Sequence, residues 1–505
     1  MPGILHVKRM QYTFIFMEQA FQEQLSINIT LIKALAPMTP RTQAPHADSS
    51  PGTVLFIVSS VQFLTPFMSS SVGIALPVIG QEFQASAMQL GLIQMMYILA
   101  VSITMLPAGR FADIHGRKRI FIAGTVVCIL STLAIPLCMG IRTFILFRLF
   151  QGIGAAMITA TSFAILTSVF PESKRGKAMG IVVAFVYLGL AAGPTLAGIM
   201  VTHMGWRWIF YFMLPVQITA LVLTLTRLRG EWADSKGDTF DWQGSVVFAL
   251  ALSILITGMT RINKMPGAWI MIMAGLLGLA LFFQIQKKTK SPLIDVHLLT
   301  HNLTFTLSNI ATLINYAASF GIIFLFSLYL QYTKGFSAQT AGFIMMVQPL
   351  TQALLSPLAG RLSDTYPATW IATLGMAVCT VGLFLASFMG MTTSLAVILS
   401  MLILQGIGFG LFSTPNMNAI MSSVQPRYYG TASSMVGTMR TQGMLVSMAT
   451  VTVIITHYLG DQAVTPENMG QFMKSMQISL RIYTVMGLVG IIFSLGRRSR
   501  RVNHP

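Results

Sequence analysis

Long runs of apolar residues, separated by short polar stretches, dominate this sequence from residue 54 onward. Each run is about as long as the ~20 residues that a helix needs to cross a hydrocarbon core. Backbone groups inside a bilayer must find partners within the same segment, so the runs predict membrane-spanning α-helices. Fourteen helices are predicted, over residues 54–79, 88–108, 119–139, 143–169, 177–202, 207–227, 242–260, 267–286, 304–331, 340–360, 370–389, 393–414, 430–456 and 476–496.

Lysine and arginine gather in alternate connections between these runs. Cytoplasmic connections carry an excess of such residues, so the alternation predicts which side of the membrane each connection faces. Both termini are predicted to be cytoplasmic, which requires an even number of helices and agrees with fourteen. The cations on the predicted cytoplasmic side lie within residues 110–119, 174–177, 227–236 and 287–290, at Arg361 and Arg427, and in the tail 497–501.

Composition excludes several other classes of protein. A chain of 505 residues that is 54% hydrophobic and 9% charged is not a soluble globule. The net charge of +18 lies in the connections, so it predicts topology and contact with anionic lipids of the bilayer, and no nucleic acid. The three cysteines fall inside apolar runs, so no disulfide framework and no metal site is expected. No cofactor or catalytic residue is expected, and no nucleotide motif suggests ATP as the energy source.

The first 50 residues differ from the rest, because they are mixed polar and lack a long apolar core. They do not resemble a signal peptide. Either residues 1–37 are an amphipathic or disordered extension, or translation starts at Met38. We favour the second reading, because nothing in residues 1–37 pairs with later features.

The two ends of the chain repeat each other. The tetrapeptide QGIG occurs at residues 151–154 and again at 405–408, and Pro171 and Gly176 recur as Pro426 and Gly430. Six helices therefore match six helices, and helices 242–260 and 267–286 are an insert. Parallel repeats around a site at mid-membrane are typical of transporters. The predicted divisions are a cytoplasmic tail (1–53), a first half (54–227), a linker with two inserted helices (228–290), a second half (291–496) and a basic tail (497–505).

The stretch GRFADIHGRKR, residues 109–119, stands out between the second and third runs. It is predicted to be a short cytoplasmic loop. Asp113 can act as the counterion of Arg117 or Lys118, or can face a helix N-terminus. A weaker copy, GRLSD, occurs at residues 360–364 in the second half.

These motifs resemble those of the major facilitator superfamily. GRFADIHGRKR is similar to its signature loop, RLFQGIG (148–154) to its fourth-helix motif, and GLAAGPTLAG (189–198) to the fifth-helix motif of antiporters. GWRWIFYFMLP (205–215), FDWQG (240–244), SPLID (291–295) and FSLYLQ (326–331) resemble the fourteen-span drug:proton antiporter branch. The resemblance covers nearly all of residues 54–496, and implies an all-α membrane fold of two six-helix halves plus two inserted helices.

The resemblance implies roles for two groups of residues, the 109–119 loop with its weaker copy and the fifth helix. The loop is expected to latch one conformation of the alternating-access cycle, a role that a merely cationic turn would lack. The residues of this latch are Gly109, Asp113, Gly116, Arg117, Lys118 and, in the weaker copy, Gly360 and Asp364. The fifth helix is expected to be pliable and tightly packed through Gly189, Gly193, Pro194 and Gly198, although ordinary helix packing explains the same glycines.

Two arginines lie inside predicted helices. Arg148 lies about one turn into its run, where an unpaired cation costs roughly 2.5–3.5 kcal/mol or more. We expect it to serve coupling or the substrate pathway with Gln151, Gly152 and Gly154; the alternative is that it reaches the nearby external interface. Arg440 lies near the middle of the thirteenth run and is expected to line the pathway.

The sequence departs from the resembled branch at a position that matters for coupling. An aspartate is common seven residues before the ALP tripeptide, and here that residue is Met68. All Asp and Glu residues fall in connections, tails or helix ends. Three explanations remain open: protons are handled near Asp113 and Arg148 or by Glu82; the carrier is uncoupled or driven differently; or the substrate is neutral or anionic. We favour the third for the substrate and leave the coupling open.

Polar residues inside the runs are candidates for the lining of a cavity, although hydrogen bonds between helices explain them equally well. The candidates are Met68, Ser69, Gln94, Asn315, Tyr316 and Gln348. The leading hypothesis is a monomeric secondary transporter of the plasma membrane that exports hydrophobic or amphipathic molecules, with protons as the counter-substrate. The alternatives are a dedicated exporter of one metabolite, and a membrane sensor that no longer transports.

Overall fold

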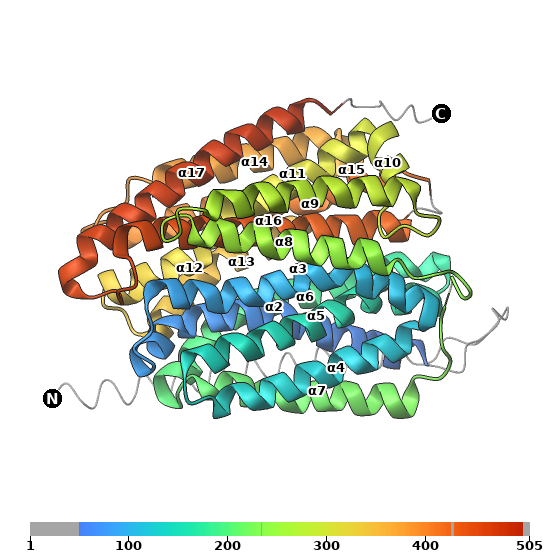
Figure 1. Ribbon diagram of the computed structural model, residues 1–505, viewed down its shortest axis with the longest axis horizontal. Helices are drawn as coiled ribbons and strands as arrows, with labels where there is room; N and C mark the ends of the chain where they lie inside the picture. Colours follow the sequence, from blue (N-terminus) through green and yellow to red (C-terminus); the bar gives the residue numbers. More distant parts are fainter. Residues whose placement is uncertain (1–49, 234, 426–428, 498–505) are drawn as a thin grey trace.

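The computed structural model describes residues 50–233, 235–425 and 429–497, without the side chains of 172, 173, 429 and 430. Within these ranges the protein is a bundle of helices, fourteen of which are long and apolar enough to cross a membrane (Figure 1). These are α2 (Pro51–Glu82), α3 (Ala87–His115), α4 (Arg117–Ala134), α5 (Ile141–Val169), α6 (Glu172–His203), α7 (Arg207–Arg227), α8 (Trp242–Arg261), α9 (Ala268–Lys288), α11 (Leu303–Ser319) continued by α12 (Gly321–Leu328) and η2 (Tyr329–Thr333), α13 (Ala338–Thr365), α14 (Ala368–Ala386), α15 (Leu395–Ser422), α16 (Tyr429–Leu459) and α17 (Met469–Leu495). The short helices are η1 (Ile135–Leu137), α10 (Val296–His301) and η4 (Pro466–Asn468).

The number and kind of the predicted helices are confirmed, but several predicted boundaries are wrong. The helix α3 continues to His115, α15 continues to Ser422, and α17 begins already at Met469. An apolar run reports only the depth of the hydrocarbon, whereas the helical hydrogen bonds continue into the polar interface. The predicted helix 304–331 is interrupted at Phe320, where the Gly321 amide donates to the Ser447 hydroxyl at 2.9 Å.

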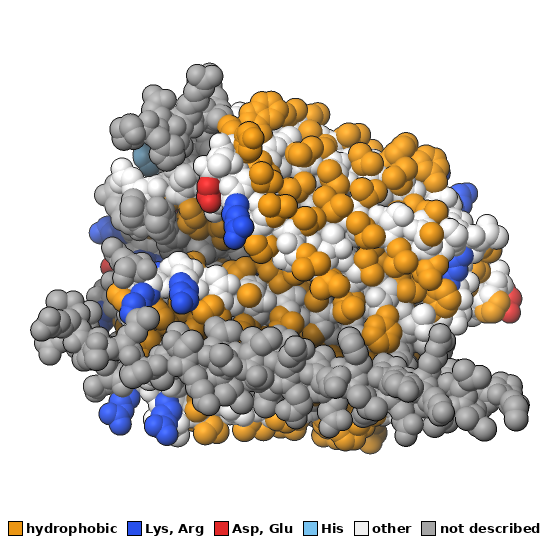
Figure 2. Space-filling model, turned by 180° about the vertical axis from the view of Figure 1, so that it is seen from behind, with side chains coloured by type: hydrophobic (Ala, Val, Ile, Leu, Met, Phe, Trp, Pro, Cys, Tyr) orange, Lys and Arg blue, Asp and Glu red, His pale blue; other side chains and the backbone are white. Residues whose placement is uncertain are grey.

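The helices form two groups with a pair between them. Helices α2–α7 pack on one another, as do α11–α17, and the halves meet where α6 lies on α13, α3 on α16 and α2 on α12. The pair α8 and α9 runs along the boundary, where α8 contacts both α3 and α16 (Figure 1). On the face shown in Figure 2, apolar side chains cover most of the described surface, and the few charged ones lie mainly toward its left and right sides.

The sequence repeat corresponds to a repeat in packing. Gly154 of α5 packs on the Gly124 carbonyl of α4, and Gly408 of α15 packs in the same way on the Gly375 carbonyl of α14. A Cβ built on Gly154 would lie 2.6 Å from the Gly124 carbonyl oxygen, and a Cβ on Gly124 would lie 2.9 Å from the Gly154 carbonyl oxygen. Both helix pairs therefore need glycine to approach this closely.

The two halves are joined at the end where α2 finishes and α3 begins. The Ser327 hydroxyl donates to the Gly73 carbonyl at 2.7 Å, and the Tyr332 hydroxyl donates to the Pro77 carbonyl at 3.1 Å. The Ala87 amide of α3 donates to the Gln462 carbonyl of the second half at 3.1 Å. The described conformation is therefore closed at the end opposite the cation-rich stretch 109–119. Predictions about residues 1–37, Pro426, Arg427, Arg498, Arg500 and Arg501 lie outside the described residues.

Candidate functional site

The stretch 109–119 is not the loop that the sequence predicted. Gly109 and Asp113 lie in the last turns of α3, α4 begins at Arg117, and only Gly116 stands between the two helices. Gly116 has φ +116°, a region that favours glycine, so one residue is enough to turn the chain. The second copy is likewise helical, because Gly360 and Asp364 lie near the end of α13.

Asp113 and Arg117 form an ion pair across this turn. The Asp113 carboxylate accepts from Arg117 Nε at 2.9 Å and lies 2.8 Å from its terminal nitrogen. Arg117 also donates to the Ser168 hydroxyl of α5 at 2.9 Å, so the pair ties three helices together. Sequence reasoning offered Arg117 and Lys118 as alternative partners of Asp113, and the geometry selects Arg117.

Lys118 is held instead by the α7–α8 linker, which comprises residues 228–241 with 234 not described. Its ammonium donates to the Leu228 carbonyl at 2.5 Å, and its backbone amide donates to Glu231 at 2.8 Å. The backbone amide of Arg117 donates to the Trp232 carbonyl at 2.9 Å. The linker therefore satisfies two of the free backbone donors at the start of α4.

Arg110 fixes the other side of the linker. It donates to the Ser235 hydroxyl at 2.9 Å and pairs with Asp238 at 2.5 Å. The Phe111 ring packs edge-on against Phe240, with 5.2 Å between ring centroids. In the described conformation the stretch 109–119 is thus docked on the α7–α8 linker, an arrangement that the motif alone did not predict.

Replacement of Gly116 by alanine should destabilise the protein more than a positive φ alone explains. The added Cβ would lie 2.6 Å from a Glu231 carboxylate oxygen, in addition to a backbone strain of about 1–3 kcal/mol. Gly205→Ala is the matched control, because Gly205 has φ +92° but nothing within 4 Å of an added Cβ. Thermal unfolding in detergent should show a larger fall in Tm for Gly116→Ala. Equal falls would mean that the linker does not restrain the turn.

Arg148 lies at the centre of a polar cluster in the first half. Its side chain is fully buried, so it does not reach the external interface. It donates to Gln151 Oε1 at 2.6 Å and to Gln94 Oε1 at 3.2 Å, and its guanidinium lies 4.2 Å from the centre of the Tyr97 ring. These partners balance the charge without a carboxylate, through neutral oxygens and the face of an aromatic ring.

The cluster extends to the neighbouring helices through the two glutamines. Gln94 donates to the Ser69 carbonyl of α2 at 2.9 Å, and Gln151 donates to the Thr132 hydroxyl of α4 at 3.0 Å. Gly152 of α5 packs against the backbone of Tyr97, where a Cβ would overlap the carbonyl. Arg148 therefore connects four helices, and close packing fixes its position.

The second half lacks this cation. Gly406, the repeat of Gly152, packs on the Gln348 backbone just as Gly152 packs on Tyr97. The residue that corresponds to Arg148 is Leu402, and Gln405 Oε1, which corresponds to the acceptor on Gln151, has no hydrogen-bond partner. The Arg148 cluster is a property of the first half alone, and the repeat in the sequence could have revealed this.

The predicted antiporter helix α6 packs on α2 of its own half and on α13 of the second half. A Cβ on Gly189 or Gly193 would overlap atoms of α2, namely the Phe63 carbonyl and the Ser70 hydroxyl. A Cβ on Gly198 would lie 2.6 Å from the Ala338 carbonyl of α13. The carbonyl of Pro194 lies against Gly342 of α13 in the same way. These glycines thus set the distance between α6 and its neighbours on both sides.

The candidate cavity residues have different surroundings in the part of the chain that the structure describes. Met68 faces a small cavity inside the first half, and Ser69 and Gln94 bond to each other beside Arg148. Asn315 is buried in the second half, with its amide nitrogen unpaired. These side chains therefore belong to separate parts of the two halves.

Tyr316 and Arg440 do lie together, between the two halves. Tyr316 packs edge-on against Phe409, with 5.5 Å between ring centroids, and its hydroxyl interacts electrostatically with Arg440 of α16 and Tyr187 of α6. All three polar side chains are partly exposed. A cation and two phenols, contributed by both halves, thus lie within interaction range of one another.

Two further charged residues, Glu82 and Arg497, have partners that the sequence did not predict. Glu82 pairs with Arg207 at 2.6 Å and accepts from the Trp206 indole at 2.6 Å, at the end of the bundle opposite 109–119. Arg497 is not a solvated tail residue: it is buried and donates to Asn416 at 2.6 Å. Burial lowers the pKa of Arg497 to about 10, so it remains charged at neutral pH. In the sequence Arg497 follows the last apolar run, so it was predicted to belong to the basic cytoplasmic tail.

Two packed groups of six helices with a repeated core, closed at one end, define a membrane transporter of the two-half type. The family model of the Major Facilitator Superfamily matches residues 58–309 and 308–504. The chain therefore belongs to this superfamily. It is 30% identical to the riboflavin transporter RibZ of Clostridioides difficile (strain 630) over 390 residues, which cover 77% of this chain and 84% of that protein.

Other relatives carry different names. The chain is 29% identical over 398 residues to the multidrug resistance protein Stp of Mycobacterium tuberculosis (strain CDC 1551 / Oshkosh), covering 77% of this chain and 73% of that one. A solved bacterial homologue of the human lysosomal transporter Spinster, in an inward-facing conformation, matches with a TM-score of 0.63 at 16% identity, covering 88% of this chain and 96% of that one. At this identity the structural match supports the fold alone.

Proposed function

We propose that this protein exports hydrophobic or amphipathic small molecules by alternating access, with protons moving in the opposite direction. Relatives named as multidrug resistance proteins support the substrate class. The close packing of α6 on α2 and α13 and the closed end of the bundle are consistent with two halves that rock about a central site. In this proposal the protein acts as a monomer in the plasma membrane.

The group formed by Tyr187, Tyr316 and Arg440 is the observation that carries the proposal. It combines aromatic rings with one cation, and every described acidic residue lies in a connection or at a helix end. A lipophilic cation would meet the like charge of Arg440 there, whereas a planar neutral or anionic molecule would meet a hydrogen-bond donor and ring faces. We therefore place the preferred substrates among neutral and anionic aromatic compounds.

Replacement of Arg440 by glutamine should weaken the binding of an anionic aromatic dye about tenfold or more, since a charge-assisted hydrogen bond contributes roughly 1.5–3 kcal/mol. Fluorescence titration of the purified protein measures this. Lys474→Gln, which removes an exposed cation near the start of α17, is the matched control. Unchanged anion binding in Arg440→Gln would remove Arg440 from the substrate site.

A second function is favoured by the relative named as a riboflavin transporter. Under this alternative the protein exports one planar metabolite only. Flux of a panel that includes riboflavin and several unrelated dyes separates the two functions. Transport of a single compound would favour the dedicated exporter, and transport of none would favour a sensor.

A further inference from the structure

A small, partly enclosed cavity lies in the core of the first half, beside the Arg148 cluster. Its volume is about 20 Å³, and side chains from α2, α3, α4, α5 and α7 line it. The lining includes Met68, Tyr97, Thr125, Cys128 and Gln217. A space of this size holds one water molecule and excludes any organic substrate.

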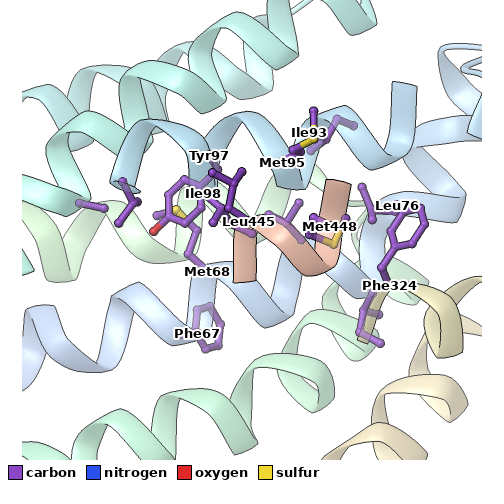
Figure 3. Packing of buried hydrophobic residues seen from close by; sticks show 14 of the residues in the cluster. Phe67, Met68, Leu76, Ile93, Met95, Tyr97, Ile98, Phe324, Leu445 and Met448 are labelled. Carbon is purple, nitrogen blue, oxygen red and sulfur yellow. The ribbon is translucent and has the colours of Figure 1, made fainter. Parts of the chain in front are cut away.

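Two polar atoms on the wall of this cavity have no partner. They are the Tyr97 hydroxyl and Gln217 Oε1, and each residue is only 4% exposed. Figure 3 shows the Tyr97 ring beside Met68, and both side chains line the cavity. A buried polar group without a partner costs about 1–3 kcal/mol, so two such atoms on one cavity point to an occupant.

The two unpaired atoms are the ends of a chain of contacts that is otherwise complete. Arg148 donates to Gln151, Gln151 donates to Thr132 at 3.0 Å, and Gln217 donates to the same Thr132 hydroxyl at 3.4 Å. At the other end, the Tyr97 ring carries the Arg148 guanidinium on its face. One molecule that accepts from Tyr97 and donates to Gln217 would close this chain into a ring.

We propose that the cavity binds a single water molecule, which accepts a hydrogen bond from Tyr97 and donates one to Gln217 Oε1. Water provides both a donor and an acceptor at this size, whereas a cation would be repelled by Arg148. Empty cavities in proteins are lined by apolar groups, and this one is not. The water completes a ring through α3, α4, α5 and α7, and so holds Tyr97 against Arg148.

X-ray radiolytic footprinting of the wild-type protein in ¹⁸O-water tests this directly. Hydroxyl radicals formed from a bound water oxidise the side chains beside it, even where bulk solvent does not reach. Met68 is 3% exposed, and Met95 and Met448 are 0% exposed outside the cavity lining, so they are matched controls. Met68 and Tyr97 should be labelled several-fold more than Met95, Met448 and the buried Tyr483. Equal labelling would overturn the proposal.

A double-mutant cycle gives an independent test. Tyr97→Phe and Gln217→Leu should each lower Tm, because each leaves the water with one partner fewer. The double variant should lower Tm by clearly less than the sum, since it replaces both partners with apolar groups. It should also reduce the labelling of Met68 to that of Met95. Additive effects together with unchanged labelling of Met68 would contradict a shared water.

Discussion

Replacement of Arg148 by methionine is expected to abolish transport and to lower Tm strongly. The substitution keeps an unbranched side chain, which is shorter, and removes the Arg148 donors to Gln151, Gln94 and the Ile93 carbonyl. Each orphaned buried acceptor costs about 1–3 kcal/mol. Arg148→Lys should retain part of the stability but not the transport, because an ammonium cannot reproduce the planar fork or its stacking on Tyr97.

Transport and stability have to be measured separately for these variants. Flux in proteoliposomes reports the first, and thermal unfolding of the same preparation reports the second. Arg261→Met is the matched control, since Arg261 is an exposed arginine at the end of α8. Wild-type flux in a folded Arg148→Met variant would show that the cluster is dispensable for the transport cycle.

Replacement of Gly342 by alanine should open the closed end of the bundle. An added Cβ would overlap the Pro194 carbonyl of α6, where the two halves touch. Because the contact is made between backbones, no side chain can move away to relieve it. The halves should therefore separate at this end, and the population of the opposite conformation should rise.

Distances between spin labels at Met204 and Ser337 report this shift, because both residues are exposed at the facing ends of α6 and α13. Gly180→Ala is the control on α6, since nothing lies within 4 Å of its added Cβ. In that variant alanine should stabilise the helix by about 0.5–1 kcal/mol and leave the distances unchanged. If Gly342→Ala gave the wild-type distances, the contact between α6 and α13 would not determine the closed state.

The fold was predictable because its main cause, the length and spacing of the apolar runs, can be read from the sequence. Apolar length determines where helices cross a bilayer, and the QGIG repeat marks equivalent positions, which pack alike as Gly152 and Gly406 do. The ends of helices were less predictable, since the polar residues of 109–115 continue α3 instead of forming a loop. Hydropathy carries no information about helical hydrogen bonds beyond the hydrocarbon.

The candidate site was predictable only where its residues are close in sequence. Arg148 was identified as a cation in an apolar run, and Gln151 as its neighbour one turn away. Gln94 and Tyr97 come from α3, and their contact with Arg148 depends on how two helices cross. The docking of 109–119 on the α7–α8 linker was missed for the same reason, because ion pairs such as Arg110 with Asp238 join distant segments.

Flux of an aromatic dye from proteoliposomes, with and without an imposed pH gradient, is the most direct test of proton-driven export. Protein-free liposomes and the Arg148→Met variant provide the background. Our account predicts that an inward proton gradient accelerates export by the wild-type protein, and that the acceleration is lost in the variant. Export that is indifferent to the gradient, or no flux of any dye, would contradict it.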